Sequence, residues 1–161
     1  MRVEARSPIT LDIAKPAVLA ALSAFPSDGE RERMTAMSKR IRDGHAARRA
    51  NVAKLRAAGV TILAGSDAVN AGQFPGAGLH DEVAKLVEAG MTPGEALRAA
   101  THDNARFLAG AQADFGDVAP GQRADLVLVD GDPSADIAAA QRITHVWLDG
   151  VELLRHARPP Q

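Results

Sequence analysis

The sequence predicts an α/β protein in which helices flank one buried strand and a small β module follows. An apolar stripe at helical spacing runs through residues 30–58, which indicates a helix. The next residues, Val60 to Ala64, form a short apolar run rich in β-branched side chains, which indicates a buried parallel strand. After residue 110, short apolar runs alternate with turn signals, which is typical of a small β structure.

The composition narrows the classes of function. A chain of 161 residues corresponds to about one domain, and its formal net charge of -1 does not favour a nucleic-acid or anionic membrane surface. Aromatic residues make up only 3%, so platforms for stacking bases or sugars are not expected. Because there is no Cys, disulfides and thiolate metal sites are excluded, and any metal must be held by His and carboxylates.

The N-terminal part carries no targeting signal that the sequence reveals. It lacks an apolar signal-peptide core, and no run reaches the roughly 18 apolar residues of a membrane span. We therefore expect a cytoplasmic protein, although the same pattern would follow if the true N-terminus were missing. Residues 7–13 are a candidate short strand, and Pro16 fits the first turn of a helix over residues 16–24.

The helix over residues 30–58 is predicted to have two distinct faces. Its apolar stripe contains Met34, Met37, Ile41, Val52 and Leu55. Its basic residues are Arg31, Arg33, Lys39, Arg40, Arg48 and Arg49, which we interpret as a solvated face rather than a binding surface. Gly44 is a candidate break in this helix, and Gly59 is placed to end it in the left-handed conformation.

Polar and small residues from Gly65 to Gly78 follow the predicted strand, and loops of this length are usually functional or disordered. A helix over residues 79–89, closed by Gly90, comes next. The sequence Thr92-Pro93-Gly94-Glu95 then predicts a capping box for a helix that runs to about Ala100. A further short helix over residues 103–109 is predicted to end at Gly110.

The last third of the chain predicts three strands. They cover residues 124–130, residues 143–148 and residues 151–154. Asp149-Gly150 between the last two is a hairpin turn signal.

Ser66 and Asp67 directly follow the predicted strand. The C-terminal end of a parallel strand lies on the ligand-facing rim of an α/β sheet or barrel. A carboxylate there can ligate a divalent cation, accept a proton from metal-bound water, or do both. The alternative is that Asp67 only caps a loop or helix by accepting backbone N–H groups, and the local pattern leaves both interpretations open.

The five histidines are less informative. His80 lies at a predicted helix start, two residues before Glu82, and could be a metal ligand, a substrate contact or a proton relay; the alternative is an ordinary polar residue at a helix start. We interpret His45, His102 and His145 as structural or surface residues, and His156 lies in the tail.

Several motifs are absent from the sequence. There is no Walker loop, no Gly-x-Gly-x-x-Gly, no Gly-x-Ser-x-Gly and no His-Glu-x-x-His, so phosphate-binding and serine-hydrolase chemistry have no support. A nucleotide-binding α/β domain is accordingly a weak alternative. A catalytic zinc site needs about three protein ligands, and Asp67 with His80 does not complete one.

Residues 58–68, Ala-Gly-Val-Thr-Ile-Leu-Ala-Gly-Ser-Asp-Ala, resemble the eighth-strand segment of the amidohydrolase superfamily. The resemblance is to the branch that contains imidazolonepropionase-like and prolidase-like enzymes. The helices that follow this strand in the family are similar to residues 80–83, 88–93, 95–101 and 104–108. The family's return to its small β-sandwich and its closing hairpin are similar to residues 116–133 and 143–154. The resemblance covers about residues 45–155 in the family's order.

This resemblance implies a (β/α)₈ TIM barrel that carries one or two divalent metals, usually zinc. It implies hydrolysis of carbon–nitrogen bonds in a small-molecule substrate by metal-activated water. Asp67 matches the family's eighth-strand Asp, a metal ligand and catalytic proton shuttle. His80 matches a family His of variable role, and we take it, with Ser66, as a candidate contact of the substrate or of the metal ligands.

The sequence also departs from the family pattern. The first-strand His-x-His pair, the fourth-strand Lys or Glu and the fifth- and sixth-strand histidines are absent, and a complete barrel takes about 250 residues. We therefore expect a C-terminal fragment that is inactive alone. Residues 1–110 would be the last strand–helix units of the barrel, residues 111–155 a β-sandwich module, and residues 156–161 a loose tail.

Two kinds of partner follow from the fragment interpretation. One is the missing N-terminal part of the same enzyme, and the other is a second copy of the chain. An alternative function is a non-catalytic remnant or scaffold that associates with a partner chain through its exposed barrel edge.

Overall fold

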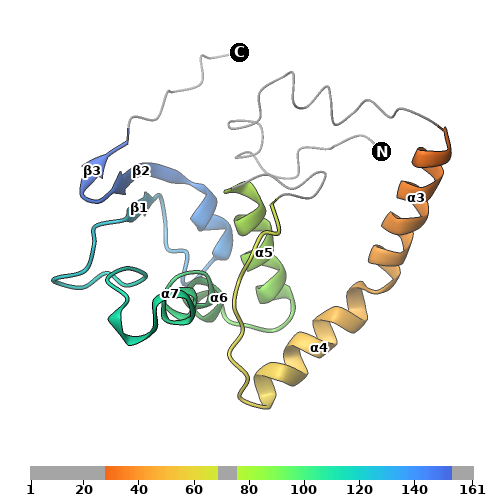
Figure 1. Cartoon of the computed structure of the whole chain (residues 1–161), viewed down its shortest axis with the longest axis horizontal. Helices are drawn as coiled ribbons and strands as arrows, with labels where there is room; N and C mark the ends of the chain where they lie inside the picture. The colour runs from red at the N-terminus through yellow and green to blue at the C-terminus, as the bar shows by residue number, and fades with distance from the viewer. Residues whose placement is uncertain (1–27, 69–75, 154–161) are drawn as a thin grey trace.

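The computed structural model describes residues 28–68 and 76–153. The predicted strand over residues 7–13, the helix over residues 16–24 and the tail over residues 156–161 lie outside these residues. Figure 1 shows α3 and α4 along one side of the molecule, the three-stranded sheet on the opposite side, and α5, α6 and α7 between them. The elements are α3 (Asp28–Asp43), α4 (His45–Ala57), α5 (Ala77–Glu88), α6 (Pro93–Ala100), α7 (His102–Ala109), η1 (Gly110–Gln112), β1 (Leu126–Val129), η2 (Ile137–Gln141), β2 (Ile143–Leu148) and β3 (Val151–Glu152).

The predicted helix over residues 30–58 is present as α3 and α4, and Gly44 divides it as expected. Gly59 has a φ of 76° and ends α4 in the left-handed conformation. The N–H of Val60 donates to the carbonyl of Leu55 (3.0 Å) and the N–H of Gly59 to that of Arg56 (2.9 Å), the paired bonds of a Schellman motif. The predicted apolar stripe is largely uncovered, since Met37 is 64% exposed.

The prediction of a strand at Val60 to Ala64 is wrong. These residues are extended but belong to no strand of the structure, and only Ala64 is buried. A strand is defined by the backbone ladder it shares with a neighbour, and within the described ranges the only sheet contains β1, β2 and β3. The segment over residues 60–67, hereafter the extended segment, therefore packs by its side chains and a few hydrogen bonds.

The three helices that follow agree with the sequence. The predicted loop from Gly65 to Gly78 is wrong at its end because α5 already begins at Ala77; residues 69–75 lie outside the described part. The capping box is confirmed: the Thr92 hydroxyl accepts from the N–H of Glu95 (3.2 Å), and the Glu95 carboxylate accepts from the N–H of Thr92 (2.7 Å). Gly90 and Gly110 have positive φ after α5 and α7, as predicted for helix ends.

The hydrophobic core lies between the extended segment, α5 and α6. Its buried members are Ala64, Val83, Leu86, Met91, Ala96 and Ala99. Val52 of α4 and Ile137 of η2 pack against this core from either side. The core therefore joins the helical part to the segment between β1 and β2.

The β module is an antiparallel sheet in the order β1-β2-β3. The strand limits predicted for residues 143–148 are confirmed, and the first strand is shorter than predicted. Asp149 and Gly150 both have positive φ (50° and 76°), as a two-residue type I′ hairpin turn requires. A register shift leaves Thr144 unpaired in the ladder, and its hydroxyl donates instead to the carbonyl of Leu128 (3.1 Å).

The described residues thus form a mixed helix and sheet fold. Among them, no helix is long and apolar enough to cross a membrane.

Candidate functional site

The extended segment ends at Ser66 and Asp67, the residues that the sequence singled out. Ser66 is partly buried, and Asp67 is exposed. Asp67 has a φ of 48°, a left-handed conformation that is uncommon for residues other than Gly but is tolerated by Asp and Asn. The backbone therefore changes direction at this carboxylate, directly after the extended residues.

Ala64 fixes the extended segment to the helices. Its N–H donates to the carbonyl of Ala99 (3.3 Å), and its carbonyl accepts from the Nδ2 of Asn104 (2.8 Å). Ala64 is only 6% exposed and belongs to the core. Both backbone polar groups of a buried residue are thus satisfied by the α6–α7 pair, three residues before Asp67.

Asn104 was not predicted as a site residue. The only signal in the sequence is an amide side chain directly before Ala105, which proves to be buried. An amide beside a buried position on a helix needs a hydrogen-bond partner, but the sequence does not say which.

His80 lies in the first turn of α5, next to Leu79, which packs against the same core as Ala64. Partial burial lowers the pKa of His80 from its ordinary value of 6.5, and the negative charge of Asp81 opposes this effect. The imidazole is therefore mainly neutral at neutral pH, the form that can bind a metal or accept a proton. The segments that carry Asp67 and His80 therefore pack on the same core.

The described residues do not by themselves make a metal site. Across residues 28–68 and 76–153 there is no group of three or more His, Asp or Glu side chains able to hold a metal ion. A catalytic zinc needs about three protein ligands. Asp67 and His80 have suitable donor atoms, but this donor set does not fit a complete site.

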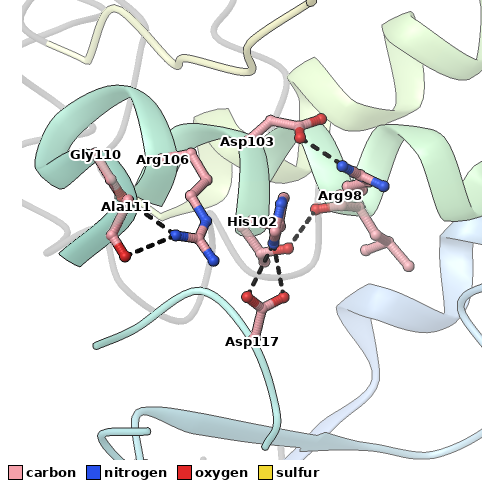
Figure 2. Close-up of polar contacts among 9 residues, drawn as sticks. Arg98, His102, Asp103, Arg106, Gly110, Ala111 and Asp117 are labelled. Carbon is pink, nitrogen blue, oxygen red and sulfur yellow. Dashed lines mark hydrogen bonds and ion pairs between the residues drawn. The ribbon is translucent and has the colours of Figure 1, made fainter. Parts of the chain in front are cut away.

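A second polar cluster lies at α7 and the loop that leads to β1 (Figure 2). The Nδ1 of His102 lies 2.9 Å from both carboxylate oxygens of Asp117. Arg98 donates to Asp103 (3.0 Å), and Arg106 donates to the carbonyl of Ala111 (2.9 Å). These contacts join elements of the chain to one another, and His102, for which we predicted a structural or surface role, takes part in them.

A shallow pocket of about 240 Å³ lies beside this cluster, lined by residues between Asp117 and Leu126. It is formed by the loop before β1 and does not include Ser66, Asp67 or His80. The pocket and the predicted site residues are therefore separate features.

Comparison with known proteins finds a family, sequence relatives and a solved structure that match parts of this chain. The model of the amidohydrolase family matches residues 11–153. Ochratoxinases from Aspergillus niger are 40% identical over 98 residues, which cover 58% of this chain and 19% of the ochratoxinase. A solved structure described as an amidohydrolase is 30% identical, with a TM-score of 0.43, and the match covers 50% of this chain and 20% of that one.

The chain thus spans about a fifth of the length of the relatives it matches. The family match, in contrast, extends over most of the 161 residues. It includes the extended segment, α5 to α7 and the β module. The chain belongs to the amidohydrolase family.

Proposed function

We propose that this chain contributes the Asp67 carboxylate to the active site of a hydrolase that acts on carbon–nitrogen bonds of a small molecule. Membership of the amidohydrolase family supports the reaction class. The observation that carries the assignment is the position of Asp67, an exposed carboxylate at the end of an extended segment that two helices hold in place.

The proposal includes the architecture expected from the sequence. Residues 1–110 would be the last strand–helix units of a (β/α)₈ barrel of the imidazolonepropionase-like and prolidase-like branch, and residues 111–155 part of its β-sandwich. In such a barrel, the extended segment would gain neighbouring strands that the described residues do not supply. The partner would be the remaining part of the same enzyme or a second copy of the chain.

A divalent metal, with zinc as the first choice, would be held in part by Asp67. The Asp67 carboxylate would orient the ion or a proton at its Oδ atoms, and His80 and Ser66 would contact the substrate or the metal ligands. Because the described residues offer fewer than the about three ligands of a catalytic zinc, the other ligands must come from elsewhere.

The metal part of the proposal can be tested on the whole chain with Zn²⁺ alone. We expect addition of Zn²⁺ to a ¹⁵N-labelled sample to shift the backbone signals of Ser66 and Asp67, and the substitution Asp67→Asn to remove this response. Asp43→Asn, at an exposed carboxylate paired with Lys39 on α3, is the matched control and should leave the response unchanged. A response that survives in Asp67→Asn would refute the assignment.

The hydrolytic part of the proposal is tested with a preparation of the protein that hydrolyses N-acyl amino acids or cyclic amides, by measuring the amine groups released. There, Asp67→Asn should lower kcat by about 10² to 10⁴-fold, the usual contribution of a positioned acid or base. Undiminished turnover would show that Asp67 has no role in the reaction.

A further inference from the structure

We infer that Asn104 is a positioning residue for Asp67, acting through the carbonyl of Ala64. The inference rests on the proposed function of Asp67. Asn104 lies 40 positions from Ala64 in the sequence, and through this carbonyl its side chain sets where the Asp67 carboxylate lies.

The contact itself is specific. The Nδ2 of Asn104 donates to the Ala64 carbonyl at 2.8 Å, a normal length for an N–H···O bond, and the contact is partly buried. It joins the side chain of a residue in α7 to the backbone of the extended segment. Asn104 lies in α7, whereas the other polar group of Ala64 is bound by the carbonyl of Ala99 in α6.

The contact matters for Asp67 because Ala64 lies only three residues before it in the extended segment. A strand in a ladder is held at every second residue, but the extended segment has no ladder among the described residues. The two hydrogen bonds at Ala64 therefore contribute, together with the packing of Ile62 and Ala64 on the core, to the position of this segment against the helices. The chain then needs only three residues to reach Asp67, where it changes direction at a φ of 48°.

Because Ala64 is buried, removing the Asn104 amide is expected to destabilise the position of the Ala64 carbonyl. Ala64 is 6% exposed, so its carbonyl would lose its partner without gaining water if the amide were removed. The backbone would then be expected to move until the carbonyl finds solvent, and Asp67 would move with it.

The test uses nuclear magnetic resonance on the whole 161-residue chain and a graded series at one position. Asn104→Leu removes the donor at similar size, and Asn104→Asp places a carboxylate oxygen against the carbonyl oxygen. We expect the amide signals of residues 64–67 to shift more in Asn104→Asp than in Asn104→Leu, each compared with the unchanged protein. We expect the H–N–Cα–H coupling of Asp67 to lose its left-handed value in both variants.

Thr101→Val is the matched control. It removes a hydrogen bond at the same helix junction, from the Thr101 hydroxyl to the Leu97 carbonyl (2.9 Å), without touching the extended segment. We expect it to leave the Asp67 coupling unchanged. A purely structural role of Asn104 would lower stability without changing this coupling beyond the change in Thr101→Val, and that result would overturn the inference.

The unmodified protein gives an independent measurement if a variant fails to fold. The hydrogen bond predicts a scalar coupling between the Nδ2 of Asn104 and the carbonyl carbon of Ala64, and slow exchange of the Asn104 amide protons. Absence of both would overturn the inference.

The Zn²⁺ titration separates this inference from the proposed function. If Asp67 moves in Asn104→Leu but does not respond to Zn²⁺ in the unchanged protein, the positioning role stands and the metal role fails. If Zn²⁺ binds at Asp67 but Asp67 keeps its conformation in Asn104→Leu, the metal role stands and the positioning role fails.

Discussion

Gly116 lies in a confined position beside α7. Its φ is 95°, and a Cβ added there would lie 2.5 Å from the Cβ of Ala105 and 3.0 Å from the carbonyl oxygen of Thr101. Both neighbours belong to the start of α7, so Gly116 lets the loop before β1 approach this helix closely. Neither the close approach nor its partners can be read from the sequence.

We expect Gly116→Ala to lower the free energy of unfolding by about 1–3 kcal/mol more than Gly121→Ala, because it adds a steric clash to the backbone cost. Gly121 is the matched control, since it also has a positive φ (86°) but no atom within 4 Å of an added Cβ. Urea unfolding of the two variants measures the difference. Equal stabilities would show that the loop moves away from α7 without cost.

The Glu95 carboxyl group has a pKa well below its ordinary value. The hydrogen bond from Arg56 and those from the backbone and side chain of Thr92 lower its pKa from 4.5 to about 2. Since the pKa is lowered on folding, the carboxylate stabilises the folded state above about 4.5, and this stabilisation is lost as the pH falls towards about 2.

We therefore expect the difference in free energy of unfolding between the unchanged protein and Glu95→Gln to be present at neutral pH and to decrease as the pH falls from about 4.5 towards about 2. Gln keeps the capping geometry, so the substitution tests the charge. Glu88→Gln is a control, since Glu88 forms a longer ion pair of 3.6 Å with Arg49. A Glu95→Gln difference that does not change with pH would contradict the expected role of the ionised form.

At the scale of elements, the helix ends follow local chemistry. Thr92, Pro93 and Glu95 place the start of α6, and Gly59 and Gly90 end α4 and α5 with a positive φ. Each signal acts within about one turn, because it satisfies backbone groups that a helix leaves unpaired at its ends. Such ends can therefore be predicted from sequence.

Thr92→Ala should lower the free energy of unfolding by about 1 kcal/mol, because the N–H of Glu95 loses its acceptor. Thr92→Ser keeps a hydroxyl and should lose much less. Chemical denaturation of both variants measures the effect. If Ala and Ser gave the same stability, the capping box would not contribute to the fold.

The extended segment illustrates the opposite case. Its β-branched run predicts a strand, but the residues at 60–64 belong to no sheet among the described residues. A strand depends on neighbours that are distant in sequence, whereas a helix carries its own hydrogen bonds. The same limit hid the contact between Asn104 and Ala64, which joins residues 40 positions apart.

At the scale of the whole molecule, the buried apolar side chains are mostly small and several large ones are exposed. Among residues 28–68 and 76–153, nine of the twelve buried hydrophobic residues are Ala, while larger side chains such as Met37, Phe107 and Leu108 are 64%, 74% and 73% exposed. A core built of small side chains removes little apolar surface per residue. The proposal of a larger barrel gives these exposed side chains a place to pack, and the family match is consistent with it.

The sequence by itself determined the start of α6, the ends of α4 and α5, the hairpin at Asp149 and Gly150, the family, and the choice of Asp67 as the candidate residue. All of these depend on local backbone chemistry or on motifs that are continuous in the chain. Only the tertiary structure decided that residues 60–64 form no strand, that Gly116 contacts α7, and that Asn104 holds the segment leading to Asp67. These features depend on contacts between distant residues, for which a single sequence carries no direct signal.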